Sequence, residues 1–183
     1  LDRAVVYQEI GRAYRKRGWH SEALHALEQA LELDADGAPF HRDAAIVLSK
    51  LGRQEDAIAH LQKALTLLPN GNKPPSEGEA ASEAAKQARS SGARDAVSPK
   101  EAAWRHELAS LYEEAGRLEE AVDAYREAVS LEPAHPAYNH RLGVAYGRLG
   151  ELGEAVRYLR RAVELSPNRA DWYGDLAEAL SDS

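Results

Sequence analysis

The chain has 183 residues, a net charge of −7 and no cysteine or methionine. The absence of cysteine excludes disulfides and thiolate chemistry, and the negative charge disfavours non-specific nucleic-acid binding, which needs clustered cations facing phosphates. Apolar residues form 44% of the chain and charged residues 29%, and no apolar stretch approaches the roughly 20 residues that span a bilayer. We therefore expect a helical domain with a solvated surface and no membrane insertion.

The beginning of the chain gives little information about its compartment. No segment at Leu1 has the charged start, apolar centre and small-residue end of a leader peptide, so we expect a soluble chain. The cytoplasm is favoured only slightly over the periplasm, because the absence of cysteine does not separate the two. We interpret a chain that starts at leucine and has no methionine as a fragment or a processed form.

Four glycines divide most of the chain into units of equal length. Gly18 and Gly52 stand 34 residues apart, as do Gly116 and Gly150, while the middle interval is 64 residues. A fixed period of this size indicates a solenoid of repeated units. Aligned on the glycines, the four repeats cover residues 4–37, 38–71, 102–135 and 136–169.

Small and large residues alternate down these repeats in fixed columns, numbered here from the first residue of each repeat. Position 8 is glycine or alanine, positions 20 and 27 are alanine in all four repeats, and position 24 is leucine or tyrosine. Two short antiparallel helices can then approach closely, so each repeat is predicted to be a helix pair. Glycine at position 15 ends the first helix as a left-handed cap, and proline at position 32 stops the second in three repeats. Position 7, which is Ile10 in the first repeat, is assigned to the buried set.

With these columns, the chain resembles the tetratricopeptide repeat family at seven of the eight columns of its motif. The departure is the first column, often tryptophan in the family, because here the aromatic residue stands one position earlier. Phe40, Trp104, Tyr138 and Trp172 occupy that earlier position. The resemblance covers most of the chain outside 71–98, and it implies an all-α, right-handed α-solenoid of four helix-turn-helix repeats.

An insertion at 72–101, rich in alanine, proline, glycine and serine, separates repeats two and three. It has too few large apolar residues for a core of its own, and we expect at most a short helix within 79–90. Ser98, Pro99 and Glu101 have the pattern of a helix start, so the first helix of repeat three is predicted to begin there. We interpret the insertion as an excursion from one continuous superhelical domain, and a hinge is the alternative.

The segment 170–181 is predicted to be a capping helix that packs Trp172, Leu176 and Leu180 onto repeat four. Trp104 and Tyr138 are likewise assigned to the core. Trp19 stands at an exposed turn, where it either packs over that turn or marks a contact surface.

In the family that the chain resembles, positions 2, 5, 9, 12 and 13 of the first helices line a concave groove. Repeats one and two make this groove basic, repeat three makes it acidic and repeat four mixed. A peptide with acidic residues towards one end and basic residues towards the other would match it, and a merely solvated face is the alternative. The candidate peptide-binding residues are Gln8, Arg12, Arg15, Lys16, Arg42, Ile46, Lys50, His106, Ser110, Glu113, His140, Val144 and Arg148.

Some members of this family grip the terminal carboxylate of a chaperone. The corresponding positions here are Gln8, Arg12, Asp43, Ala103 and Glu107. Asp43 and Glu107 would repel a carboxylate, which disfavours binding of this kind.

No arrangement of residues predicts a catalytic, cofactor or metal site. His106 and His140 share a column in adjacent repeats, but no third close ligand completes a metal set. The resemblance instead implies a non-catalytic scaffold that binds a peptide or protein segment in its groove. The alternatives are a regulatory or targeting arm of a larger enzyme, such as a transferase, and an adaptor that assembles into homo-oligomers.

Overall fold

The computed structural model describes residues 2–68 and 93–182, with the backbone alone at 93–98. Over these two ranges the chain forms nine helices and no strand. The chain divides into two compact units, Leu1–Val97 and Ser98–Ser183. The short helix predicted within 79–90 and the stop at Pro69 lie outside the described residues, and the single continuous superhelix stays a prediction.

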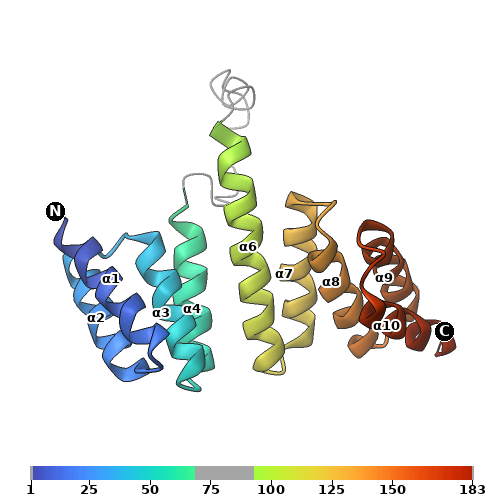
Figure 1. The fold of residues 1–183 in the computed structure, drawn as a ribbon, viewed down its shortest axis with the longest axis horizontal. Coiled ribbons are helices and arrows are strands. Elements are labelled where there is room, and N and C mark those ends of the chain that lie inside the picture. Colours follow the sequence, from blue (N-terminus) through green and yellow to red (C-terminus); the bar gives the residue numbers. More distant parts are fainter. Residues whose placement is uncertain (1, 69–92, 183) are drawn as a thin grey trace, which may run out of the picture. The chain divides into compact units, whose positions relative to one another are not determined.

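The first unit contains two helix pairs, in which consecutive helices run antiparallel (Figure 1). The helices are α1 (Arg3–Lys16), α2 (His20–Leu33), α3 (Ala38–Lys50) and α4 (Gln54–Thr66). They correspond to the two predicted repeats. Asp2 caps α1, because its side chain accepts a hydrogen bond from the Ala4 backbone at 3.0 Å.

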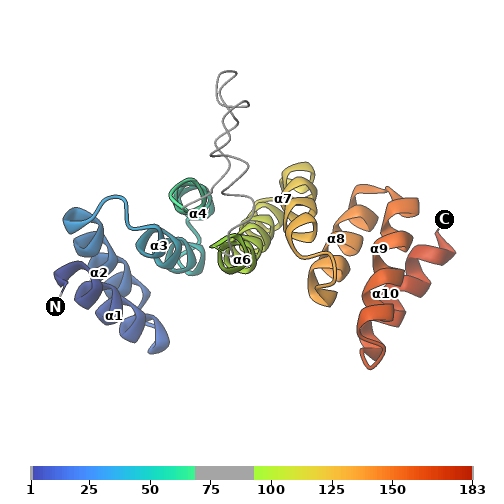
Figure 2. The ribbon, with the colours of Figure 1, turned by 90° about the horizontal axis from the view of Figure 1, so that it is seen from above.

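The second unit contains the other two pairs and a solitary last helix. Its helices are α6 (Ala93–Glu114), α7 (Leu118–Leu131), α8 (Pro136–Leu149), α9 (Leu152–Leu165) and α10 (Ala170–Ser181). The first residues of α6 belong to the other unit. Within each unit the first helices of the pairs lie on one side and the second helices on the other (Figure 2). We call the side formed by the first helices the first-helix face.

The four repeat glycines end the first helices as predicted. Gly18, Gly52, Gly116 and Gly150 have φ between 75° and 85°, a region that residues with a Cβ atom rarely adopt. In each case the next residue bonds back to the last turn of the helix, as Trp19 does to the Tyr14 carbonyl at 3.0 Å. The period of 34 residues therefore has a backbone cause.

The small residues of the columns mark where the helices of a pair approach. A Cβ atom on Gly11 would lie 2.8 Å from Cγ of Leu27, and one on Gly143 would lie 2.7 Å from Cγ of Leu159. The alanines at positions 20 and 27 are fully buried in all four repeats. The predicted small-against-large packing within each pair is thus confirmed.

Adjacent repeats are joined by the aromatic column. Phe40 packs with Ala30 of the preceding second helix, Tyr138 with Ala128, and Trp172 with Ala162. Trp104, Tyr138 and Trp172 are buried, as predicted. A large ring on one repeat therefore fills the space that a small residue leaves on the repeat before it.

Two predicted core residues are exposed instead. Ile10 is 40% exposed and Leu180 is 48% exposed. Among the described residues, no earlier helix covers the side of α1 that carries Ile10, and no second helix packs over the side of α10 that carries Leu180. Column position alone therefore does not bury a residue in the outermost helices.

The predicted start of the first helix in repeat three is wrong. Helix α6 begins at Ala93, so that Pro99 lies inside the helix and Ser98 is no cap. The preceding residues include Ala93, Arg94 and Ala96, which favour helix, and so the segment continues the helix upstream. The cost is the hydrogen bond that the missing N–H of Pro99 would donate.

Trp19 packs over its own turn, which was one of the two alternatives that the sequence left open. Its ring centre lies 5.8 Å from that of Tyr14, and the Arg17 guanidinium lies 5.5 Å from it. The side chain is nevertheless 49% exposed. Throughout the described parts of the chain, no helix combines the length and the apolar character needed to cross a membrane.

Candidate functional site

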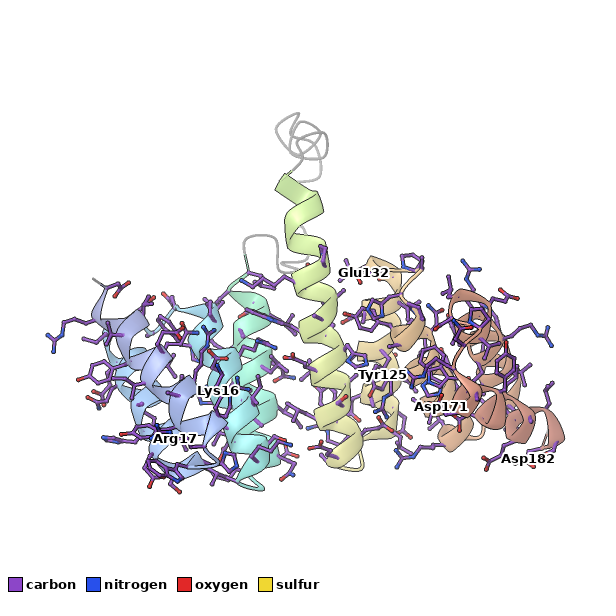
Figure 3. All side chains as sticks on the ribbon, in the orientation of Figure 1. Lys16, Arg17, Tyr125, Glu132, Asp171 and Asp182 are labelled. Carbon is purple, nitrogen blue, oxygen red and sulfur yellow. The ribbon has the colours of Figure 1, made fainter. Side chains whose placement is uncertain are left out.

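All the candidate residues lie on the first helices of their repeats. Those of the first unit stand on α1 and α3, and those of the second on α6 and α8. Figure 3 shows Lys16 at the carboxyl end of α1, beside the turn that carries Arg17. The first-helix face is thus the site to examine, in each unit separately.

Polar side chains join neighbouring first helices at residues 35 apart in the sequence. Position 5 of one repeat meets position 6 of the next, as Gln8 Nε2 donates to Asp43 Oδ2 at 2.6 Å. The same geometry joins His140 Nε2 to Asp175 Oδ2 at 2.6 Å. We call such a pair a position-5 rung.

In the position-5 rung of the first unit, two candidate residues already have a partner within the chain. Asp43 is buried, and its Oδ2 also accepts a hydrogen bond from Arg12 Nε at 2.7 Å. Gln8 is buried beside it, and Arg12 is half-buried and also paired with Glu9 at 2.7 Å. The buried carboxylate of Asp43 therefore engages donors of Gln8 and Arg12, and their role in binding a peptide stays a prediction.

A second kind of rung joins position 12 of one repeat to position 13 of the next. In the second unit, Arg148 Nη1 donates to Glu113 Oε1 and forms an ion pair with it. In the first unit, the same two positions hold Arg15 and Lys50. The position-12 rung thus has opposite charges in one unit and two positive charges in the other.

Arg15 and Lys50 form no hydrogen bond or ion pair among the residues that the structure describes. The Nε atom of Arg15 is buried without a hydrogen-bond partner, although the side chain as a whole is half-buried. Lys50 and the neighbouring Lys16 are exposed. This end of the first-helix face therefore presents three cations without a carboxylate.

In the second unit, a tyrosine draws two candidates into the interior. Tyr125 stands at position 24, which is leucine in the other repeats, and its hydroxyl lies 3.1 Å from Ser110 Oγ and donates to Glu113 Oε2 at 2.8 Å. Burial raises the pKa of Tyr125 above its ordinary value. Figure 3 places Tyr125 on α7. Ser110 and Glu113 therefore both contact this hydroxyl.

His106 is packed among aromatic rings. Its ring centre lies 5.2 Å from that of Tyr125 and 4.9 Å from that of Tyr138. Burial lowers the pKa of His106 to about 4, with Arg141 and His135 adding to the effect. The ring is therefore neutral at pH 7, and its buried Nε2 has no hydrogen-bond partner.

His140 fixes the last helix instead of facing His106. Its ring stacks on Trp172 with centres 4.6 Å apart, while its Nε2 binds Asp175. Among the described residues no three His, Cys, Asp or Glu side chains form a group that could hold a metal ion. His140 thus positions α10 on repeat four.

The apolar candidates differ in their surroundings. Val144 lines a cavity of about 300 Å³ between α8, α9 and α10, and Arg148 and Glu178 are among its other lining residues. Ile46 and Arg42 are half-buried on α3. Each unit thus has apolar side chains beside the charges of its first helices.

Comparison with known proteins gives the family. Tetratricopeptide repeat models match residues 9–72 and 136–169, and a TPR repeat model matches residues 109–150. The chain belongs to the tetratricopeptide repeat family. No curated protein matches it.

Solved structures of other tetratricopeptide repeat proteins have the same fold. A structure entitled "Crystal structure of MamA protein" is 18% identical with a TM-score of 0.76, covering 99% of this chain and 82% of the other. MamA from Desulfovibrio magneticus RS-1 is 18% identical with a TM-score of 0.72, covering 100% and 92%. YrrB, described as "a TPR protein with an unusual peptide-binding site", is 17% identical with a TM-score of 0.71, covering 97% and 76%.

Sequence reasoning missed the rungs of this tetratricopeptide repeat chain. Asp43 and Asp175, the acceptors of the two position-5 rungs, stand at position 6, which is not among the expected groove positions. The available signal was the spacing of 35 residues, which pairs position 5 with position 6 and position 12 with position 13. Reading those pairs together would have shown which cations already have a carboxylate.

Proposed function

We propose that this chain is a non-catalytic scaffold that binds a segment of another protein along its first-helix face, and that the first unit holds an acidic residue of that segment. The observation that carries the proposal is the difference between the two position-12 rungs. Glu113 supplies a carboxylate to Arg148 in the second unit, whereas Arg15 and Lys50 stand at the equivalent positions without one.

The buried Nε atom of Arg15 supports the same proposal. A guanidinium nitrogen that is removed from water without a partner is costly, and a carboxylate is the partner that a guanidinium binds best. Lys16 and Lys50 are exposed and free to add charge around it. An acidic side chain of the bound segment would therefore take the place that Glu113 has in the other unit.

Residues beside these cations would contact other side chains of the bound segment. Ile46, at position 9 of α3, offers apolar surface beside these cations. The Arg12 guanidinium donates to Asp43, so its position is fixed and its charge is already partly neutralised. The printed description of YrrB as having a peptide-binding site agrees with a role of this class for the fold.

A cross-linking experiment tests where a partner binds. A photoreactive residue at Ile46 is compared with one at Glu28, which is exposed on the second helix α2. After irradiation in a lysate of the source cells, we expect a partner to be captured from position 46 and not from position 28. Equal capture from both positions, or capture from 28 alone, would overturn binding on the first-helix face.

Charge reversal tests the acidic feature separately. R15E/K50E is expected to lose the partner captured from position 46, because both cations of the rung become repulsive to a carboxylate. R53E/K63E reverses two cations of the same unit that lie outside the first helices, and it should retain the partner. If R15E/K50E keeps the partner, the ligand does not use this rung.

A further inference from the structure

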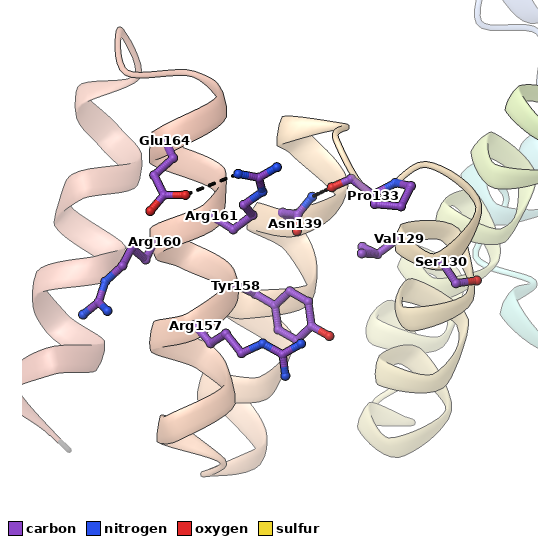
Figure 4. Close-up of a pocket in the computed structure, with 9 residues that line it drawn as sticks. All are labelled: Val129, Ser130, Pro133, Asn139, Arg157, Tyr158, Arg160, Arg161 and Glu164. Carbon is purple, nitrogen blue, oxygen red and sulfur yellow. Dashed lines mark hydrogen bonds and ion pairs between the residues drawn. The ribbon is translucent and has the colours of Figure 1, made fainter.

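A cleft on the opposite side of the second unit lies between the second helices α7 and α9. Its volume is about 480 Å³. Figure 4 shows Val129 on α7 and Pro133 in the following loop on one side, with Tyr158 between the helices. Arg157, Arg160 and Arg161 line it from α9. The α7 side of the cleft therefore has apolar surface, and the α9 side carries three arginines and one carboxylate, Glu164.

The three arginines are peculiar to repeat four. Their equivalents are Asp123, Arg126 and Glu127 in repeat three, Ala59, Gln62 and Lys63 in repeat two, and His25, Glu28 and Gln29 in repeat one. No other repeat has more than one Lys or Arg at these positions. Because the helix pair forms without them, the fold does not explain this cluster in a chain of net charge −7.

The positive charge of the cleft is available to a ligand. Arg160 forms no hydrogen bond or ion pair with any described residue, and all three arginines are exposed. Arg157 pairs with Glu154 at 3.0 Å and Arg161 with Glu164 at 3.4 Å, within the same helix. Such exposed pairs contribute little, so an incoming carboxylate can replace them.

Helix α10 of the same chain has the complementary surface. Tyr173 and Leu180 are 45% and 48% exposed and share one flank of the helix. Asp171, Glu178 and Asp182 follow the opposite flank, and Figure 3 shows Asp171 and Asp182 near the two ends of α10. Small residues, Gly174, Ala177 and Ser181, lie between the flanks and allow close approach.

We propose that α10 of one copy docks into the α7–α9 cleft of a second copy. The acidic flank meets Arg157, Arg160 and Arg161, while Tyr173 and Leu180 contact Val129 and Pro133 on the α7 side. The two surfaces are different patches of one chain, so the contact is head-to-tail and produces rings or open chains. It uses the cleft between the second helices α7 and α9 of one copy and helix α10 of the other.

Charge reversal on each side tests this contact, with molar mass measured by light scattering from micromolar to near-millimolar concentration. The mass of the native chain should rise with concentration and fall with added salt. R157E/R160E/R161E and E178K/D182K should each remain monomers. R17E/R53E/K63E, which reverses three exposed cations of the first unit, should associate as the native chain does.

The decisive experiment mixes the cleft variant R157E/R160E/R161E with the α10 variant E178K/D182K. The first retains a native α10 and the second retains a native cleft, so a one-to-one mixture should associate. The acidic cleft of the first and the basic α10 of the second also carry opposite charges, so the mixture should regain association that neither variant shows alone. Y173A/L180A tests the apolar flank and should also weaken association. A native chain that stays monomeric throughout, reversed variants that associate normally, or a mixture that remains monomeric would each overturn the proposal.

Discussion

Glu113 on α6 and Arg148 on α8 form an ion pair across 35 residues of sequence and so join two consecutive repeats. Glu113 also accepts the hydroxyl of Tyr125, which places its carboxylate between two donors. The equivalent rung of the first unit contains Arg15 and Lys50 instead. This difference is the basis of the proposal that the first unit binds a carboxylate from outside the chain.

K50E supplies that carboxylate from within the chain. We expect the variant to lose binding of an acidic segment and to keep or slightly raise its stability, by up to about 1 kcal/mol, because an exposed pair contributes little. Binding is measured with the cross-linked partner, and stability by urea unfolding. A variant that binds the partner as well as the native chain would contradict the role of the rung.

D43N tests the buried carboxylate of the first unit. Removing its charge weakens the hydrogen bonds from Gln8 and Arg12, and we expect a loss of about 2 kcal/mol in the free energy of unfolding. D56N is the control, since Asp56 is exposed and pairs with the exposed Arg53, and it should change stability by less than about 1 kcal/mol. Equal effects of the two variants would show that Asp43 has no special structural role.

The helix pairs were predictable because their cause is local and repeated. Glycine at position 15 sets the backbone of the turn, and the alanine and leucine columns set the packing, so each repeat confirms the others. The start of α6 was not predictable in this way. The capping pattern at Ser98 competed with helix-favouring residues before it, and the helix continued through Pro99.

The candidate site was predictable as a face but not residue by residue. Gln8 and Arg12 stand at groove positions, yet the buried Asp43 engages both, and this depends on a contact between repeats. Ser110 and Glu113 are similarly engaged because Tyr125 replaces a leucine in its column. Such contacts follow from which residue stands 35 positions away, and a single repeat does not contain that information.

Close packing of the helix pairs predicts opposite effects for two glycines of repeat four. G143A would place a Cβ atom 2.7 Å from Leu159 Cγ and 2.9 Å from the Leu159 backbone nitrogen. The backbone must then shift, and we expect a loss of about 1–3 kcal/mol in the free energy of unfolding. G153A has no atom within 4 Å of the new Cβ, and it should stabilise the chain by up to about 1 kcal/mol. Urea unfolding of both variants checks this, and equal stabilities would contradict the close approach.

The buried imidazole of His106 predicts a fall of stability in weakly acidic solution. Its pKa is lowered to about 4 in the folded chain, so the unfolded chain takes up this proton first as the pH falls. The contribution is fully present above about pH 6.5, and it is lost progressively down to the folded pKa of about 4.

H106F removes this titration and keeps a ring against Tyr125 and Tyr138. We therefore expect the native chain to lose more free energy of unfolding than H106F between neutral pH and pH 4, as measured by urea unfolding at a series of pH values. Carboxylate titrations are common to both chains and cancel in the difference. Parallel pH profiles for the native chain and H106F would show that the ring takes up protons equally in the folded and unfolded states, and would contradict its burial as the cause.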